Sequence, residues 1–205
     1  MAFGPMYIGQ HLINHGYRVK TLHFITKFSD NQVNDLIDKF ITSHCKLIGV
    51  SMTFVSTAMV YDRLIQVLNK IREKFPNIPI LFGGPSQFNV SNVLPNSFEV
   101  LGQNKENEII DIVNRICGKI KRIPFDFKNH KVDYNAFFPS TPPKGIPMFI
   151  EVSKGCIFDC AFCSFQLRKT KSQLKDKEQI KLEIENYYSK FNNDQIMIIC
   201  NTFND

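Results

Sequence analysis

Three cysteines stand close together near the C-terminal end of the sequence, at Cys156, Cys160 and Cys163. Their spacing, four residues and then three, allows an irregular backbone segment to direct all three thiolates toward one point. Soft thiolates select iron–sulfur clusters or zinc. Three thiolates suit a 4Fe–4S cluster that leaves one iron open to a substrate or cofactor. The spacing therefore predicts an iron–sulfur site with a vacant coordination position.

Zinc and inert thiols are the alternatives at this cluster. A structural zinc site takes four ligands, usually from two short-spaced pairs. The sequence holds no second pair, and Cys200 is the nearest candidate for a fourth ligand. A disulfide framework is not expected, because the cluster has an odd number of cysteines and the chain lacks signs of secretion.

Two histidines four residues apart, His11 and His15, form the other pair with metal-ligand spacing. The residues between them are Leu-Ile-Asn, so the glutamate of a zinc-protease motif is missing. We expect both histidines on the surface of a helix.

The elements expected before these cysteines alternate between helix and strand. Gly16 should end the first helix, and Asp30 or Asn31 should cap the second. Glycines follow two later strands, at Gly83-Gly84 and at Gly102. The expected order is helix 5–15, strand 17–24, helix 30–41, strand 46–52, helix 57–75, strand 80–82, strand 98–101 and a helix ending near 117. This order predicts an α/β fold with a parallel sheet.

The cysteines themselves belong to a second pattern. Five prolines and little periodicity mark the segment from Ile123 to Pro147 as a linker packed along the surface. A strand is expected at 148–152, the cysteine loop at 153–163, a helix at 172–191 and a second strand at 195–200. The second segment is therefore expected to be a βαβ unit.

Composition and charge exclude several classes of protein. The 205 residues are 43% hydrophobic, enough to bury a core, which excludes disorder as the main state. No apolar run reaches the roughly 20 residues of a membrane-spanning helix, and no secretory signal is seen, so we expect no membrane partner and a cytoplasmic location. The net charge of +6 is spread along the chain and does not predict nucleic-acid binding.

The densest basic stretch runs from Arg168 to Lys181 and includes Lys175. Carboxylates such as Asp176 and Glu183 alternate with it or follow it. This mixture is typical of a solvated helix surface, and contact with an anionic partner is the alternative.

The cysteine loop resembles a known motif. The segment Glu151-Val-Ser-Lys-Gly-Cys156-Ile-Phe-Asp-Cys160-Ala-Phe162-Cys163 is similar to the cluster loop of the radical S-adenosylmethionine superfamily, which carries CxxxCxxC with an aromatic residue before the last cysteine. In that family too the loop follows the first strand of an α/β unit. The resemblance implies that Cys156, Cys160 and Cys163 ligate a 4Fe–4S cluster and that Phe162 lies beside the adenine of S-adenosylmethionine. Plain core packing is the other interpretation of Phe162 and Phe158.

The resemblance also implies an activity. In such enzymes an external reductant supplies one electron to the cluster, which cleaves S-adenosylmethionine to methionine and a 5′-deoxyadenosyl radical. The radical would abstract hydrogen from a substrate, here unidentified, and transfer of a methyl group from cobalamin to that substrate is the alternative. No further residue is assigned a catalytic role.

The first half resembles the cobalamin-binding-type domains that precede some radical S-adenosylmethionine enzymes. The resemblance is carried by the strand Leu47-Ile-Gly-Val-Ser51-Met-Thr53, the turn Ile80-Leu-Phe-Gly83-Gly84-Pro85 and the segment Val100-Leu-Gly102. It implies that Ser51, Thr53, Gly83, Gly84 and Gly102 face the cofactor, since ligands bind at the strand ends of such sheets. The Asp-x-His-x-x-Gly motif of domains that coordinate cobalt through histidine is absent, so cobalamin binding and its absence both stay open.

The expected organisation has three parts. Residues 1–123 would form a Rossmann/flavodoxin-like, cobalamin-binding-like domain that lacks its first strand, residues 124–146 a linker, and residues 147–205 the first βαβ portion of a radical S-adenosylmethionine (β/α) barrel. We expect a piece of a longer enzyme or a split one, with a second chain completing the barrel. The alternative is a non-catalytic module in which a cluster or zinc is structural, because an open barrel does not seal a radical from water.

Overall fold

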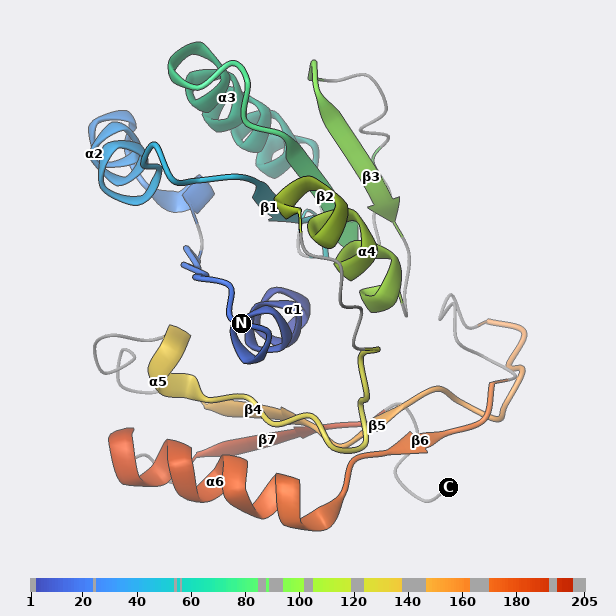
Figure 1. Ribbon diagram of the computed structural model, residues 1–205. Helices are drawn as coiled ribbons and strands as arrows, with labels where there is room; N and C mark the ends of the chain where they lie inside the picture. Colours follow the sequence, from blue (N-terminus) through green and yellow to red (C-terminus); the bar gives the residue numbers. More distant parts are fainter. Residues whose placement is uncertain are drawn as a thin grey trace. The chain divides into compact units, whose positions relative to one another are not determined.

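The computed structural model describes residues 3–23, 25–53, 55, 57–84, 88, 94–101, 105–118, 124–137, 147–162, 170–191 and 195–200 (Figure 1). The chain divides into two compact units. We call Ala2–Ile8 with Val19–Ile123 the sheet unit, and Gly9–Arg18 with Pro124–Asp205 the cysteine unit.

The sheet unit contains a three-stranded parallel sheet in the order β1-β2-β3 (Figure 1). The strands are β1 (Ile48–Ser51), β2 (Ile80–Gly84) and β3 (Ser97–Leu101). Helix α3 (Ala58–Lys74) connects β1 to β2, and α4 (Glu106–Cys117) follows β3. The predicted α/β fold with a parallel sheet is confirmed for this part of the chain.

A nonpolar core fills the space between this sheet and its helices. Phe82 of β2 and Val67 of α3 are completely buried, and Val33 of α2 (Asp30–Phe40) joins them. The remaining members of the buried cluster are Ile37, Met52, Val55, Leu64, Leu68, Ile71, Ile80 and Leu94. Burial of this aliphatic surface is the main stabilising contribution in the unit.

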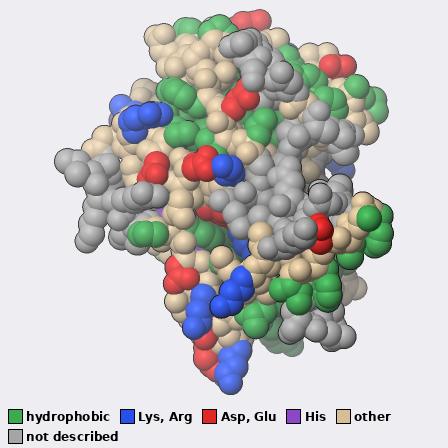
Figure 2. Space-filling model, turned by 90° about the vertical axis from the view of Figure 1, so that its right-hand side faces the viewer, with side chains coloured by type: hydrophobic (Ala, Val, Ile, Leu, Met, Phe, Trp, Pro, Cys, Tyr) green, Lys and Arg blue, Asp and Glu red, His purple; other side chains and the backbone are tan. Residues whose placement is uncertain are grey.

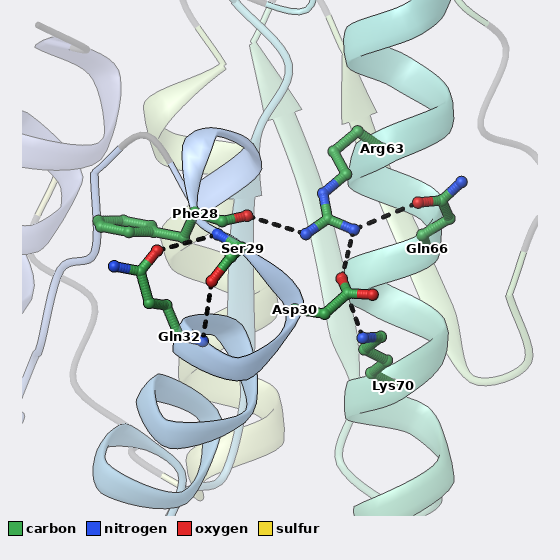
Figure 3. Close-up of polar contacts among 7 residues, drawn as sticks. All are labelled: Phe28, Ser29, Asp30, Gln32, Arg63, Gln66 and Lys70. Carbon is green, nitrogen blue, oxygen red and sulfur yellow. Dashed lines mark hydrogen bonds and ion pairs between the residues drawn. The ribbon is translucent and has the colours of Figure 1, made fainter.

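Helix α2 begins with a capping box (Figure 3). The Ser29 hydroxyl accepts a hydrogen bond from the Gln32 backbone N–H at 3.4 Å, and the Gln32 side chain accepts one from the Ser29 N–H at 3.0 Å. The prediction that Asp30 or Asn31 caps the helix is therefore wrong. The pattern Ser-x-x-Gln was the available signal for the true cap.

Asp30 instead joins α2 to α3 through ion pairs (Figure 3). Its carboxylate lies 2.7 Å from the Arg63 guanidinium and 3.0 Å from Lys70 Nζ. Arg63 also donates to the Phe28 carbonyl at 2.9 Å. Hydrogen bonds from Arg63 and then from Lys70 lower the pKa of the Asp30 carboxyl. These contacts lie at the surface and orient the two helices rather than filling the core.

Residues 17–23 form no strand, so the prediction of a strand at 17–24 is wrong for the residues described. Helix α1 (Phe3–Asn14) does end at Gly16, whose φ of 79° is left-handed, as predicted. The alternation of polar and apolar residues after Gly16 suggested a strand, but a strand forms only where a neighbour supplies hydrogen bonds. Beyond this segment the chain continues through η1 (Ile25–Lys27) into α2.

The cysteine unit contains the predicted βαβ arrangement. Strand β4 (Met148–Glu151) pairs in parallel with β7 (Ile196–Ile199), and α6 (Lys177–Phe191) connects them (Figure 1). The helix is shorter than expected, because Gln173–Leu174 form strand β6 and pair antiparallel with β5 (Ser153–Lys154). The Asp176 carboxylate accepts from the Glu178 backbone N–H at 2.9 Å and so begins the helix.

Residues 124–137, expected as part of a surface linker, bury large side chains within the cysteine unit. Phe127, Val132 and Phe137 are at most 4% exposed, and α5 (Tyr134–Phe137) begins at a tyrosine that is 1% exposed. The Tyr134 ring contacts the Tyr187 ring of α6 with centroids 5.4 Å apart. Prolines marked this segment as irregular, but its aromatic residues decide where it packs.

No helix within the described ranges combines the length and the apolar character needed to cross a bilayer. The face drawn in Figure 2 intersperses lysine and arginine side chains with carboxylates, and hydrophobic side chains also reach its surface.

Candidate cysteine site and sheet edge

The cysteine loop leaves the βαβ unit directly after β4. Ser153 and Lys154 pair with Leu174 and Gln173, so the chain that returns from the loop runs beside the chain that enters it. Farther into the loop, and one residue out of line with these pairs, the Thr170 N–H donates to the Cys156 carbonyl at 2.9 Å, and the Cys156 N–H donates to the Thr170 hydroxyl at 3.4 Å. The base of the loop is therefore closed by hydrogen bonds from Thr170 to both the N–H and the carbonyl of Cys156.

Gly155 allows this closure. Its φ of 93° is unfavourable for a residue with a side chain, and an added Cβ would lie 2.8 Å from the Lys171 carbonyl oxygen and 2.9 Å from the Thr170 hydroxyl oxygen. Any side chain here would push the returning strand away from Cys156. The glycine before the first cysteine is thus required by packing.

The predicted ligands stand at different depths. Cys156 is half-buried, Cys160 is exposed, and neither forms a disulfide. Cys163 lies outside the described residues. Within the described ranges no three His, Cys, Asp or Glu side chains form a group suited to a metal ion. Two cysteines outside any disulfide, on an irregular loop with a glycine-dependent base, fit the donor chemistry of an iron–sulfur cluster.

The hydrophobic side chains of the loop point away from any core in the described residues. Phe162 is 92% exposed, and Phe158 and Ile157 are 51% and 55% exposed. Plain core packing, the second interpretation of Phe162 and Phe158, does not apply to these positions. An exposed aromatic ring beside the last cysteine leaves its face available for stacking.

A buried ion pair lies next to the base of the loop. Lys175 directly follows β6, and its Nζ donates to Glu183 Oε1 of α6 at 2.8 Å, with the two side chains 0% and 1% exposed. The same carboxylate oxygen accepts the Val132 backbone N–H at 2.8 Å. Both residues were expected on a solvated mixed-charge surface, so that expectation is wrong. Their burial follows from tertiary packing, which charge patterning does not reveal.

Burial raises the pKa of the Glu183 carboxyl, and Lys175 and the Val132 N–H act in the opposite direction. The other carboxylate oxygen, Oε2, is buried with no hydrogen-bond partner among the described residues. Among the described residues, the hydrogen bonds to the Glu183 carboxylate are therefore made at Oε1, by Lys175 and by the Val132 N–H.

Two histidines of the cysteine unit, His11 and His130, are buried, and His15 is half-buried. His11 is 5% exposed and lies against His15 and Phe125, with ring centroids 4.3 and 5.7 Å away. The expectation of a surface position is therefore wrong for His11. His130 is 6% exposed, and burial, followed by the charges of Lys175 and other neighbours, lowers its pKa to about 3.

Lysine 154 of β5 is also buried. Its Nζ lies 5.3 Å from the centre of the Phe125 ring and 5.1 Å from that of Phe127. Contacts of this kind offset part of the cost of burying an ammonium group. Lys154, the residue just before Gly155, is thus packed against Phe125 and Phe127.

The second group of predicted site residues lies at the carboxyl end of the parallel sheet. Ser51 ends β1 opposite Gly83 of β2, and Gly84 is opposite Leu101 of β3. The Ser51 hydroxyl donates to the Thr53 hydroxyl at 3.3 Å. The structure therefore brings Ser51, Thr53, Gly83 and Gly84 together, and Gly102 lies outside the described residues.

The two glycines of this edge have a reason within the fold. A Cβ at Gly84, where φ is 89°, would lie 2.6 Å from the Thr53 hydroxyl oxygen. A Cβ at Gly83 would lie 3.0 Å from Ile109 of α4. Gly84 thus needs glycine for its backbone conformation and internal packing, whether or not a ligand approaches, whereas a side chain at Gly83 would require only a small shift of the Ile109 side chain.

The remaining cysteines lie apart from the loop in the sequence. Cys45 donates to the Leu47 carbonyl at 3.6 Å, and burial raises the pKa of its thiol. Cys117 ends α4, and Cys200 follows β7 as a half-buried free thiol.

Comparison of the chain with models of known protein families and with curated proteins gave no match. The assignment to a family therefore depends on the residues of the cysteine loop and on the elements that carry them.

Proposed function

We propose that this chain is a radical S-adenosylmethionine protein that holds a 4Fe–4S cluster on Cys156, Cys160 and Cys163. The observation that carries the proposal is the position of the loop. It follows the first strand of a parallel βαβ unit, its base is closed around Cys156, and neither Cys156 nor Cys160 forms a disulfide. The exposure of Cys160 would allow a cluster to be inserted from solvent.

Each part of the loop has a role in this proposal. Bound to the three thiolates, the cluster would supply the electron, received from an external reductant, that cleaves S-adenosylmethionine reductively to methionine and a 5′-deoxyadenosyl radical. Phe162 offers an exposed ring on which the adenine can stack. Gly155 and Thr170 hold the backbone of Cys156 in place. Free cysteine thiols suit a reducing compartment, so we place the protein in the cytoplasm.

The experiment is formation of 5′-deoxyadenosine. The chain is reconstituted anaerobically with iron and sulfide and given S-adenosylmethionine and a strong reductant. We expect 5′-deoxyadenosine from the wild type, none from Cys160→Ser, and wild-type amounts from Cys117→Ser, whose thiol is in α4 of the sheet unit. Iron binding without any 5′-deoxyadenosine would favour the non-catalytic module.

The module alternative, and a second chain that completes the barrel, are both favoured by strand β7. Its residues Ile196, Met197 and Ile198 are 40%, 48% and 56% exposed, and β4 is its partner among the described residues. Parallel strands are usually buried on both faces. A partner chain adding a strand here would cover this surface, and activity that appears only when such a chain is supplied would identify that case.

Cobalamin is the second ligand that we propose, at the carboxyl end of the sheet. The hydroxyls of the half-buried Ser51 and the exposed Thr53 lie where ligands bind in open α/β sheets. A shift in the visible spectrum of cobalamin on addition of the chain, weakened by Thr53→Val and unchanged by Thr42→Val, would support this site. An unchanged spectrum with the wild type would exclude it.

A further inference from the structure

We propose that the buried Lys175–Glu183 pair sets the register of the strand that returns from the cysteine loop and so positions the backbone of Cys156. The two residues are positioning residues, because neither is among the predicted cluster ligands. The inference rests on the proposed function only for the role of Cys156 as a cluster ligand. The ion pair and the hydrogen bonds that it concerns are present in the chain without a cluster.

The strands at the base of the loop are short. Strands β5 and β6 pair over two positions, Ser153 with Leu174 and Lys154 with Gln173. Gln173 and Leu174 are both exposed. Register is strongly specified only where one face of a strand is buried, and here the returning strand presents exposed residues. Two pairs alone therefore leave the returning strand free to slip by a residue.

The Lys175–Glu183 ion pair prevents this slip of the returning strand. Immediately after β6, the Lys175 N–H donates to the Val152 carbonyl at 2.9 Å, while its side chain reaches Glu183 in the interior. The same carboxylate oxygen, Glu183 Oε1, also accepts the Val132 N–H. A slip would withdraw Lys175 and leave a buried carboxylate without its counter-charge, which is strongly unfavourable. The ion pair thus selects one register.

The position of the returning strand also determines the contacts of Cys156, the first cysteine of the loop. With the returning strand in this position, Thr170 exchanges two hydrogen bonds with Cys156, one residue out of line with the β5–β6 pairs, and the Lys171 carbonyl lies where only a glycine at 155 leaves room. Moving the returning strand by one residue would remove Thr170 from Cys156. The pair acts on Cys156 through six residues of backbone, from 170 to 175.

A nonpolar replacement separates this role from general stability. Replacing a buried ion pair by hydrophobic residues of similar size is often neutral or stabilising, whereas removing one partner is not. The double variant Lys175→Met/Glu183→Leu should therefore keep the overall stability of the fold while losing the selection of register. The matched control is Glu185→Gln, an exposed carboxylate on the same helix, 3.9 Å from Lys181.

The test is hydrogen exchange of the metal-free chain, read at the Thr170 amide, with thermal unfolding measured beside it. We expect the double variant to unfold at the wild-type temperature or above, with exchange at Thr170 about tenfold faster or more. Glu185→Gln should change neither quantity. Wild-type exchange at Thr170 in the double variant would overturn the proposal. If the double variant unfolds early, Lys175→Arg, which keeps the charge, replaces it, and restored protection relative to Lys175→Met is then the expected result.

Iron loading distinguishes this inference from the proposed function. With a cluster-binding wild type, the double variant should lose most of its iron under conditions in which Glu185→Gln keeps it. Faster exchange at Thr170 together with a wild type that binds no iron would support the positioning role and contradict the cluster.

Discussion

The two units of this protein bury different chemistry. In the sheet unit the buried cluster consists of nonpolar side chains such as Phe82 and Val67, and the ion pairs of Asp30 lie at the surface. All the buried polar and charged side chains of the described residues belong to the cysteine unit, namely Gln10, His11, His130, Ser153, Lys154, Lys175 and Glu183.

This difference indicates what each interior does. Burial of nonpolar surface stabilises a fold without specifying direction, whereas a buried ion pair contributes little net stability but penalises every arrangement that separates it. The sheet unit positions its edge residues with regular strands, so a nonpolar core suffices. The cysteine unit must hold an irregular loop on two-residue strands, and its polar interior supplies the missing specificity.

The largest expected effect tests the nonpolar core. Phe82→Ala removes a completely buried ring from β2 and should lower the free energy of unfolding by about 3–5 kcal/mol. Urea unfolding followed by hydrogen-exchange mass spectrometry would locate the loss in peptides that cover β1, β2 and β3. Met59→Ala, at a side chain 77% exposed, is the control and should stay within about 0.5 kcal/mol of the wild type. Equal effects of the two substitutions would contradict the assignment of the core.

The next effect tests the polar interior through pH. The pKa of His130 is about 3 in the folded chain, against an ordinary value of 6.5. Below pH 6.5 the unfolded chain binds a proton at this residue and the folded chain does not, so stability is full above pH 6.5 and falls as the pH decreases toward 3. His130→Phe should make the stability of the cysteine unit depend less on pH between 6.5 and 3, as measured by hydrogen exchange in peptides from residues 124–137. An unchanged slope would show that His130 is not buried as a neutral ring.

A smaller effect is expected at the start of α2. Ser29→Ala removes the hydroxyl that accepts the Gln32 N–H and should cost about 1 kcal/mol. Asn31→Ala, at an exposed position in the same turn, is the matched control. A larger loss of stability with Asn31→Ala than with Ser29→Ala would contradict a cap at Ser29 and favour one at Asn31.

The smallest effect concerns the surface ion pairs of Asp30. Because hydrogen bonds from Arg63 and Lys70 lower its pKa from 3.8, their contribution is present above pH 3.8 and is lost as the pH falls further. Asp30→Asn should reduce the acid sensitivity of the sheet unit slightly and leave its stability at pH 7 almost unchanged. A loss at pH 7 comparable to that of Phe82→Ala would contradict the contrast between surface and core.

The sequence was sufficient for elements that are defined by their own residues. Buried runs such as 80–82 and the helical spacing of 57–75 predicted strands and helices that the structure contains. Alternation at 17–24 failed because a strand also needs a neighbour. The cap at Ser29 could have been found from its Ser-x-x-Gln pattern.

The site was less accessible to sequence analysis. Glycines and hydroxyls at the strand ends could be brought together, because parallel strands end at one edge. The pairing of Lys175 with Glu183 could not, because the sequence there is typical of a solvated helix. The position of Cys156 depends on residues 170–175 and 183, and these carry no metal-ligand motif of their own.

The most direct test of the account is the iron and sulfide content of the chain after anaerobic reconstitution, measured for the wild type, Cys163→Ser and Cys117→Ser. We predict about four irons and four sulfides per chain in the wild type and in Cys117→Ser, and loss of most of this content in Cys163→Ser. Equal iron in all three chains, or none in the wild type, would contradict a cluster held by the three cysteines of the loop.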